Sequence, residues 1–259
     1  MKRITSRDNA HFKQLKKLAH SARERRKGQR TILDGTHLLT VYLERVGIPE
    51  RVAVADSRQD APEIAGLLRN VPPEVMLVLE DSLFAEISTV ETVTGIAAVI
   101  PIPLPSAGGV GQFCLFLEAL QDPGNLGSIL RSAASAGCDK IYLSPTCVDI
   151  WSPKVLRAGM GAHFYLSILE NQALCGLAAD FPGQVLAAAP GAEHTLFETD
   201  LRGVVAFAIG NEGGGLSPEL LAAATQTVAI PMPGGMESLN AAAATAICLF
   251  EKVRQSLIP

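Results

Sequence analysis

The chain has 259 residues, enough for one or two domains, and its 48% apolar and 19% charged residues fit a protein with a buried core rather than a disordered one. Its net charge of −4 is unevenly spread, because residues 1–30 carry a net +9 and the rest a net −13. No apolar run approaches the roughly 18 residues that a membrane-spanning helix needs, and the N-terminus lacks the apolar stretch of a secretory signal. We therefore expect a cytoplasmic location and no membrane partner.

The first predicted element is an amphipathic helix over residues 9–27. Its apolar stripe consists of Phe12, Leu15, Leu18, Ala19 and Ala22. The basic side chains lie largely off that stripe, which predicts an outward cationic surface suited to a polyanion. A charged helix face that is merely solvated explains the same pattern equally well.

Apolar runs then alternate with helical stretches along the chain. The runs are 31–34, 51–55, 75–79, 95–100, 113–120, 140–144, 184–189, 203–210 and 227–232. This alternation predicts an α/β fold with parallel sheets covered on both faces by helices. The stretch IPIPLPSAGG interrupts it with alternate prolines and then glycines, which predicts a linker at 101–109 between domains at 1–100 and 110–259.

The stretch LQDPGNLGSILRSAASAG, residues 120–137, predicts the end of a strand and then a helix that Asn125 caps. The buried face of this helix is predicted to consist of Leu126, Ile129, Leu130 and Ala133. Arg131 falls among serines on another face, one or two turns above the helix N-terminus, where it is well placed to meet an anion. An arginine that is simply exposed to solvent is the alternative.

The stretch FAIGNEGGGLSPELLAAA, residues 207–224, predicts a buried strand, a loop, and a helix that begins with Ser217 as N-cap. Four glycines within six residues leave main chain exposed at the carboxyl end of a strand, where open α/β sheets bind ligands. A tight turn alone would not need so many glycines, so we favour ligand contact.

The stretch PMPGGMESLNAAAATAICLFE, residues 231–251, predicts a second exposed loop and a long terminal helix capped by Ser238 or Asn240. The predicted buried stripe of this helix is Leu239, Ala242, Ala243, Ala246, Leu249, Phe250 and Val253. Alanines at the start of the helix allow another part of the chain to approach closely.

Other chemistries lack their motifs. The glycine-rich loops do not spell GxGxxG, and neither a P-loop nor a GxSxG elbow is present. Five scattered cysteines without a CxxC pair predict reduced thiols, and the isolated histidines predict no metal site.

Together the three loops resemble the three signature motifs of the SpoU/TrmH branch of the SPOUT superfamily, the knotted RNA ribose 2'-O-methyltransferases. The matching residues are 122–127 with 131–133, then 209–217, then 230–232 with 238–240. The N-terminal part is similar, more loosely, to the small RNA substrate-binding domain of this family, which has an L30e-like fold. The resemblance implies an α/β protein with that domain at 1–100 and a SPOUT domain at 110–259, which contains a mostly parallel sheet and a deep trefoil knot.

The resemblance also implies a set of site residues and S-adenosyl-L-methionine as cofactor. The implied catalytic residues are Asn125, Arg131, Glu212, Ser238 and Asn240. The implied cofactor-binding residues are Leu186, Ala187, Ala188, Ile209, Gly210, Asn211, Glu212, Gly215, Ile230, Met232, Ser238 and Leu239. The residues expected to bind RNA are Arg23, Arg25, Arg26, Lys27 and Arg131. In the family the arginine is assigned the role of base, but a guanidinium is a poor proton acceptor, so we expect Arg131 to clamp a phosphate or the forming alkoxide.

The implied reaction transfers a methyl group to a ribose 2'-hydroxyl of RNA, and the implied assembly is a homodimer through the C-terminal domain. The discrete N-terminal domain favours large-subunit (23S) rRNA as substrate. A tRNA 2'-O-methyltransferase and a non-catalytic RNA-binding or ribosome-assembly factor of the same fold are the alternatives, and a nicotinamide-dependent oxidoreductase is disfavoured by the missing fingerprint. The 2'-hydroxyl as nucleophile restricts the expected partner to RNA and excludes DNA.

Overall fold

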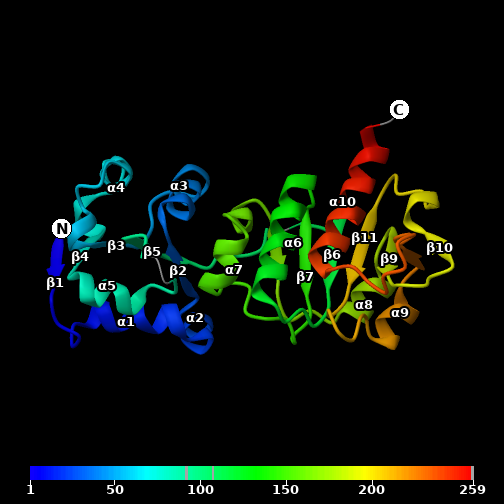
Figure 1. Cartoon of the computed structure of the whole chain (residues 1–259), viewed down its shortest axis with the longest axis horizontal. Coiled ribbons are helices and arrows are strands. Elements are labelled where there is room, and N and C mark those ends of the chain that lie inside the picture. Colours follow the sequence, from blue (N-terminus) through cyan, green and yellow to red (C-terminus); the bar gives the residue numbers. More distant parts are fainter. Residues whose placement is uncertain (91–92, 107, 258–259) are drawn as a thin grey trace. The chain divides into compact units, whose positions relative to one another are not determined.

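The computed structural model describes residues 1–90, 93–106 and 108–257 and divides into two compact units (Figure 1). Unit 1 comprises Met1–Pro103 and Trp151–Phe164, and unit 2 comprises Leu104–Ile150 and Tyr165–Pro259. The chain therefore first leaves unit 1 within the stretch 101–109 and returns to it once.

Unit 1 is built around a five-stranded sheet with the strand order β1-β4-β3-β5-β2. Its first part contains β1 Lys2–Ile4, α1 Ala10–His20, α2 Ala22–Gly28, β2 Arg30–Asp34, α3 Thr36–Arg45, β3 Arg51–Ala55, α4 Pro62–Leu68, β4 Met76–Leu79, α5 Asp81–Ile87 and β5 Ile96–Pro101, with short 3-10 helices at Asp56–Arg58 and Pro73–Val75. β5 runs antiparallel to both β2 and β3, whereas the remaining pairs are parallel. The prediction of parallel sheets therefore holds only in part for this unit, because a continuously apolar strand reveals burial on both faces but not direction.

The core of unit 1 lies between the sheet and the helices that cover it. Side chains from α1 and α5 form one buried cluster with alternate residues of the strands, including Phe12, Leu15, Phe84, Ile87 and Leu79. Helices α3 and α4 contact each other, and α3 packs on β2 and β5. Unit 1 is thus an α/β layer structure in its own right.

The predicted single helix over residues 9–27 is in fact two helices separated at Ser21. Asn9 caps α1, with its Oδ1 accepting from the His11 amide over 2.9 Å. Ser21 adopts extended backbone angles (φ −128°, ψ 110°) and its hydroxyl accepts from the Glu24 amide over 3.3 Å, so it ends α1 and begins α2. The Ser-x-x-Glu pattern at 21–24 is a capping signal that outweighs the continuous helical periodicity.

The segment Trp151–Phe164 joins unit 1, although both neighbouring stretches of chain belong to unit 2. It contains α7 Pro153–Ala158 and a 3-10 helix Ala162–Phe164. The Thr31 hydroxyl donates to the Trp151 carbonyl over 2.6 Å, and the rings of Tyr42 and Phe164 meet edge to face with centroids 5.3 Å apart. Gly161 lies so close to Val41 that an added Cβ would be 2.8 Å from the valine Cγ1. The segment is therefore packed as a part of the core of unit 1.

Unit 2 contains a seven-stranded sheet with the strand order β10-β12-β9-β11-β6-β7-β8, and every neighbouring pair in it is parallel. Its elements are β6 Phe113–Leu117, α6 Pro123–Ala136, β7 Lys140–Leu143, β8 Ser167–Leu169, α8 Leu174–Ala179, β9 Gln184–Ala188, β10 His194–Thr195, a 3-10 helix Leu196–Glu198, β11 Val205–Ile209, α9 Pro218–Ala223, β12 Gln226–Ala229 and α10 Ala241–Leu257. The parallel sheet predicted for this part of the chain is confirmed. The short edge strands β8 and β10 were not predicted, because two or three residues carry no periodic signal.

Helices cover both faces of this sheet. Alternate strand residues such as Cys114, Phe116 and Ala206 cluster with α8 and α9. On the other side α6 and α10 lie next to each other (Figure 1). Since side chains alternate along a strand, Phe113 faces α10, where the Lys252 ammonium lies 5.9 Å from its ring centre. The described residues include no helix with the length and apolar character needed to cross a bilayer.

The buried stripe of α10 differs from the predicted one. Its buried residues are Ala241, Thr245, Cys248, Leu249, Glu251 and Lys252. Phe250 is 47% exposed and Leu239 is 40% exposed, so only Leu249 was predicted correctly as buried. The pattern misled because it assigns lysine and glutamate to the surface, whereas here each finds polar partners within the protein.

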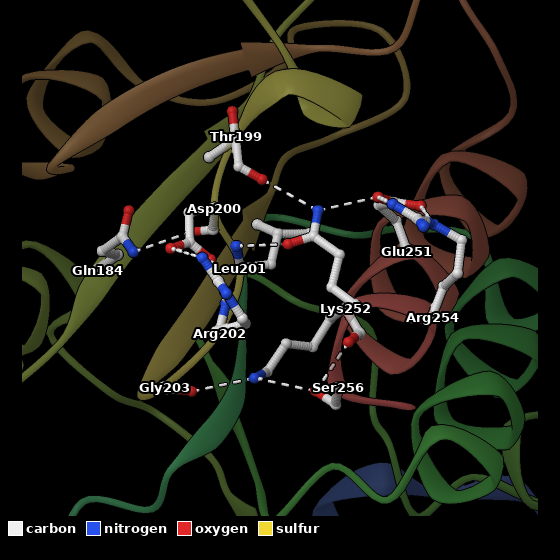
Figure 2. A network of polar contacts seen from close by, with 11 residues as sticks. Gln184, Thr199, Asp200, Leu201, Arg202, Gly203, Glu251, Lys252, Arg254 and Ser256 are labelled. Atoms are coloured by element: carbon white, nitrogen blue, oxygen red, sulfur yellow. Dashed lines mark hydrogen bonds and ion pairs between the residues drawn. The ribbon is translucent and has the colours of Figure 1, made fainter. Parts of the chain in front are cut away.

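Figure 2 shows how the C-terminal turns of α10 are attached to the segment that precedes β11. Lys252 Nζ donates to the Gly203 carbonyl over 3.0 Å. The Gln255 side chain accepts from the Leu201 amide over 2.9 Å and donates to the Thr199 carbonyl over 3.0 Å. These bonds fix one end of α10, while its other end begins directly after Asn240.

Candidate functional site

A pocket of about 390 Å³ lies at the carboxyl ends of β9, β11 and β12. Its lining residues are Ala188, Ala189, Pro190, Ile209, Gly210, Asn211, Glu212, Gly213, Gly214, Gly215, Val228, Ile230, Met232, Glu237, Ser238, Leu239, Ala241 and Ala244. The structure thus brings together every predicted cofactor-binding residue except Leu186 and Ala187, which are fully buried within β9. Both precede the carboxyl end of that strand, where the pocket lies, and their contact with the cofactor stays a prediction.

The glycines after β11 have specific structural reasons. A Cβ at Gly210 would lie 2.2 Å from the carbonyl carbon of Gly215, so no larger residue fits. Gly215 adopts the left-handed conformation with φ +67°. The main chains of Asn211 and Gly215 bond each other in both directions, over 3.0 and 2.9 Å. The result is a closed loop whose outer backbone is exposed to the pocket.

The start of α6 differs in one detail from the prediction. Asp122, not Asn125, is the N-cap, and its Oδ1 accepts from the Asn125 amide over 2.7 Å. Pro123 occupies the first helical position, where its missing N–H costs nothing. Because the cap is already supplied, the side chain of Asn125 is available for other contacts. The predicted buried face of this helix is confirmed, with Leu126, Ile129, Leu130 and Ala133 fully buried.

Three predicted catalytic residues form a chain of side-chain hydrogen bonds. Asn240 Nδ2 donates to Asn125 Oδ1 over 2.9 Å, and Asn125 Nδ2 donates to Glu212 Oε1 over 2.9 Å. An ionised carboxylate can only accept, so Glu212 forces Asn125 to present its amide nitrogen to it and its oxygen to Asn240. The direction of the whole chain is therefore set by Glu212.

The same orientation makes Asn240 the cap of α10. Its Oδ1 accepts from the amides of Ala242 and Ala243 over 2.9 and 3.3 Å. Of the two predicted caps, Asn240 is confirmed, and Ser238 instead lies exposed along the pocket. The alanines that follow let the first turn of α10 approach the pocket, where Ala241 and Ala244 are lining residues that the sequence did not point to.

Arg131 stands apart from this chain. It is exposed on α6 and does not line the pocket, and its guanidinium makes no hydrogen bond or ion pair with any residue that the structure describes. Its charge is therefore available to a partner from outside this chain.

The basic N-terminal residues do not all behave alike. Arg23, Arg26 and Lys27 are exposed on α2, as predicted. Arg25 is only 5% exposed, and its Nη1 donates to the carbonyls of Leu18 and Ala19 over 2.6 and 3.3 Å. The prediction that Arg25 faces outward is wrong, because the break at Ser21 turns it towards the end of α1. Its burial leaves Arg23, Arg26 and Lys27 as the cations of α2 that can contact RNA.

None of the five cysteines lines the pocket. All five are free, and burial raises the pKa of the Cys114 and Cys248 thiols to about 12. Burial also raises the pKa of Cys138 and Cys147. Within residues 1–90, 93–106 and 108–257, no cluster of three metal-binding side chains occurs.

Comparison with known proteins agrees with this geometry. The family model described as SpoU rRNA Methylase matches residues 112–250, which contain the pocket and the Asn240–Asn125–Glu212 chain. An uncharacterized tRNA/rRNA methyltransferase of Synechocystis sp. is 37% identical over 97% of this chain and 93% of its own. The 23S rRNA (guanosine(2553)-2'-O)-methyltransferase RlmP of Bacillus subtilis is 30% identical over 96% of this chain and 98% of its own.

A solved structure provides the same comparison in three dimensions. The SpoU methyltransferase AviRb from Streptomyces viridochromogenes, in complex with the cofactor AdoMet, superposes with a TM-score of 0.86 at 25% identity over 96% of this chain and 99% of its own. Shared folding over nearly the full length, together with the matched sequence of the pocket-bearing half, leads to one assignment. The chain belongs to the SpoU rRNA Methylase family.

Proposed function

We propose that the protein is an S-adenosylmethionine-dependent RNA methyltransferase that methylates a ribose 2'-hydroxyl, with large-subunit (23S) rRNA as its substrate. The observation that carries this proposal is a convergence at one place. Main chain after β9, β11 and β12 surrounds one pocket, and hydrogen bonds link Asn125, from the stretch 120–137, to Asn240 and to the pocket residue Glu212. Two relatives named as 23S rRNA 2'-O-methyltransferases, and the structure of the SpoU methyltransferase AviRb in complex with AdoMet, support the same reaction.

The pocket suits the proposed cofactor. Ile209, Val228 and Ile230 offer apolar surface to an adenine ring, and the loop 210–215 offers main-chain donors and acceptors to polar groups. The crowding at Gly210 keeps this loop close to the end of β11, so that backbone rather than side chain faces the ligand. When bound, the sulfonium of S-adenosylmethionine supplies a methyl group that is already activated for transfer.

In the reaction the 2'-oxygen would form a bond to the methyl carbon as the methyl–sulfur bond breaks, S-adenosylhomocysteine would leave, and the hydroxyl proton would pass to solvent water. The protein has to orient the ribose for this transfer. We assign the orientation to Asn125, Glu212 and Asn240, whose mutual hydrogen bonds hold their polar atoms in fixed directions. Ser238 adds a hydroxyl at the rim of the pocket. The guanidinium of Arg131 clamps the adjacent phosphate and stabilises the forming alkoxide.

We propose that unit 1 binds the RNA, as an L30e-like domain, through the exposed cations of α2. Arg23, Arg26 and Lys27 lie on consecutive turns and can neutralise backbone phosphates without reading sequence.

We also propose a homodimer through unit 2, which retains the deep trefoil knot of the family. In its support, α10 has an apolar face that nothing in the described chain covers, since Phe250 and Leu257 are 47% and 77% exposed and Ala243 is exposed beside them. A partner on this face would explain the sequence pattern that predicted Phe250 as buried. The free guanidinium of Arg131 would then complete the RNA site across the interface. Sedimentation should give a dimer for the wild type and a monomer for Phe250→Glu, and a wild-type monomer would end this part of the proposal.

Two measurements test the function itself. Calorimetry should detect binding of S-adenosylmethionine and none of NAD, and mapping of 2'-O-methyl groups in total RNA should reveal an rRNA site that vanishes when the gene is deleted. A lost tRNA site would favour the tRNA alternative. If the protein binds S-adenosylmethionine but deletion of the gene removes no methyl group from any RNA, a non-catalytic assembly factor would be favoured. In either case we propose that the protein acts in the cytoplasm.

A further inference from the structure

The loop after β6 and the glycine loop after β11 are joined by a series of side-chain hydrogen bonds. The Glu118 carboxylate accepts from the amide and the hydroxyl of Ser217 over 2.7 and 2.8 Å. The Ala119 carbonyl accepts from Asn211 Nδ2 over 2.8 Å. The bond between Asn125 and Glu212 follows at the other end of the series. Of these residues, Asn211 directly precedes Glu212 in the sequence, so its bond to Ala119 is the one that can hold Glu212 in place.

Asn211 uses nearly all of its hydrogen-bonding capacity inside the protein. Its Oδ1 accepts from the amides of Gly213 and Gly214 over 2.8 and 3.0 Å, and its main chain pairs with Gly215. A side-chain amide oxygen has two lone pairs, so this acceptor is saturated, and one Nδ2 proton already points to Ala119. The side chain therefore has little left to offer a ligand, although the residue lines the pocket.

The partner of this side chain is held in an unusual conformation. Ala119 has φ +54°, in the left-handed region that residues with a Cβ avoid. Its amide donates to the Ser144 hydroxyl over 3.0 Å, and its carbonyl also accepts from Gln121 Nε2 over 3.3 Å. Such a conformation persists only where the surroundings determine it, and here contacts on both sides of the residue direct its carbonyl to Asn211.

We propose that Asn211 is a positioning residue, which joins the Ala119 carbonyl to the closed loop 211–215 and thereby holds Glu212 at the side chain of Asn125. It acts through the loop and not through contact with substrate or cofactor. The kinetic consequence rests on the proposed function, whereas the structural consequence does not.

Two substitutions remove the hydrogen bond from Asn211 to the Ala119 carbonyl but keep an acceptor for the amides of the loop 211–215. Asn211→Asp keeps an oxygen for the amides of Gly213 and Gly214 but cannot donate to Ala119. Asn211→Ser introduces no charge, keeps a hydroxyl acceptor for the turn, and is too short to reach Ala119. The matched control is Gln121→Ala, which removes the other donor to the same carbonyl without touching the glycine loop.

The structural readout is the side-chain NH₂ signal of Asn125 in protein labelled with ¹⁵N at asparagine. The signal is assigned by its loss in Asn125→Ala, and no ligand is needed. Both Asn211 variants should shift it, because the bond to Glu212 loosens, and the control should leave it in place. An unchanged signal in folded Asn211 variants would overturn the proposal, and so would an equal shift in the control. If Asn211→Asp does not fold, the uncharged serine variant decides.

The kinetic readout is a split between parameters. Both variants should lower kcat by roughly 10- to 100-fold, because misplaced groups cost turnover. The Kd for S-adenosylmethionine and the KM for RNA should stay within about threefold of the wild type. A kcat equal to that of the wild type overturns the inference alone. A wild-type protein that neither binds S-adenosylmethionine nor methylates RNA would instead contradict the proposed function, and the NMR result would still decide the role of Asn211.

Discussion

Asn240 donates a hydrogen bond of 2.9 Å to Asn125, a residue 115 positions earlier in the chain. The bond connects the start of α10 with the first turn of α6, the two helices that lie side by side on one face of the unit 2 sheet. Its direction is imposed by Glu212, which accepts from the other end of the Asn125 amide. One carboxylate thus orients two amides, and through Asn240 it also determines which atom caps α10.

Replacing Asn240 by aspartate separates the cap from the catalytic chain. A carboxylate still caps α10, so the free energy of unfolding should fall by only about 0.5–1.5 kcal/mol, the contribution of the lost bond to Asn125. The new carboxylate at position 240 cannot donate to Asn125 Oδ1. The Asn125 amide would then lie between two carboxylates, those of residue 240 and Glu212, and in its present orientation it can donate only to Glu212. Turnover should therefore fall by roughly 10- to 100-fold. Asn9→Asp makes the same change at the cap of α1 and should leave both melting temperature and turnover unaltered. Full activity of Asn240→Asp would remove this chain from the mechanism.

Gly210→Ala should destroy the pocket. The new Cβ would lie 2.2 Å from the Gly215 carbonyl carbon and 2.4 Å from the Leu216 nitrogen, both of which are main-chain atoms that cannot move aside cheaply. We expect a loss of about 1–3 kcal/mol in stability and no binding of S-adenosylmethionine detectable by calorimetry. Gly234→Ala is the control, since its Cβ would meet no atom within 4 Å. Normal cofactor binding by the Gly210 variant would contradict the tight loop described above.

The triple substitution of Arg23, Arg26 and Lys27 by glutamine should flatten the dependence of RNA affinity on salt. Each lost phosphate contact lowers the slope of log affinity against log salt by about 0.7–0.9, so the triple variant should lose about 2–3 units of slope. Filter binding over a range of salt concentrations measures this. Arg69→Gln removes an exposed charge elsewhere in unit 1 and should leave the slope unchanged. If the triple variant keeps the wild-type slope, α2 is only a solvated surface.

Arg25→Gln should affect stability rather than RNA binding. The buried guanidinium donates to the carbonyls of Leu18 and Ala19, and a shorter neutral side chain would leave these acceptors without that partner. The expected cost is about 1–3 kcal/mol in the free energy of unfolding, measured by urea denaturation. A salt slope reduced as much by Arg25→Gln as by Arg26→Gln would mean that Arg25 does reach the RNA.

The buried cysteines should be inert in the folded protein. Only the thiolate attacks a disulfide reagent, and a thiol with a pKa of about 12, as for Cys114 and Cys248, is ionised in about one molecule in ten thousand near pH 8. Labelling with Ellman's reagent followed by peptide mapping should leave Cys114, Cys138 and Cys248 unmodified until denaturant is added. Their rapid modification in native protein would reveal an opening of the core that the packing does not suggest.

Much of the candidate site was predictable because its signals are local. The sequence signals there depend on neighbouring residues only. Glycine is needed at 210 and 215 by the local main chain, Ser217 and Asn240 cap the helices that follow them, and apolar runs mark where strands end. Of the residues predicted to bind the cofactor, only Leu186 and Ala187 do not line the pocket, because they lie inside β9, before its carboxyl end. The bond between Asn125 and Glu212 was not predictable from spacing, since it joins residues 87 positions apart.

The wrong predictions about the fold concern features that depend on contacts between residues distant in sequence. Lys252 can be buried because its ammonium donates a hydrogen bond to the Gly203 carbonyl. Arg25 can be buried because its guanidinium donates to the Leu18 carbonyl near the end of α1. The direction of β5 depends on its pairing with β2 and β3, which apolar composition does not encode. Only the break at Ser21 had a local signal, in Glu24, that a closer inspection of capping patterns would have found.

The excursion of Trp151–Phe164 into unit 1 has a consequence for protein engineering. Three peptide connections, after Pro103, Ile150 and Phe164, join the units, so the N-terminal unit is not a cassette that can be exchanged by cutting at 101–109. A chimera made there would insert a foreign module opposite the native α7, and the Thr31–Trp151 bond and the Tyr42–Phe164 ring contact would both be lost. A graft that transfers 1–103 together with 151–164 takes the whole of unit 1 from one parent protein and so keeps both contacts.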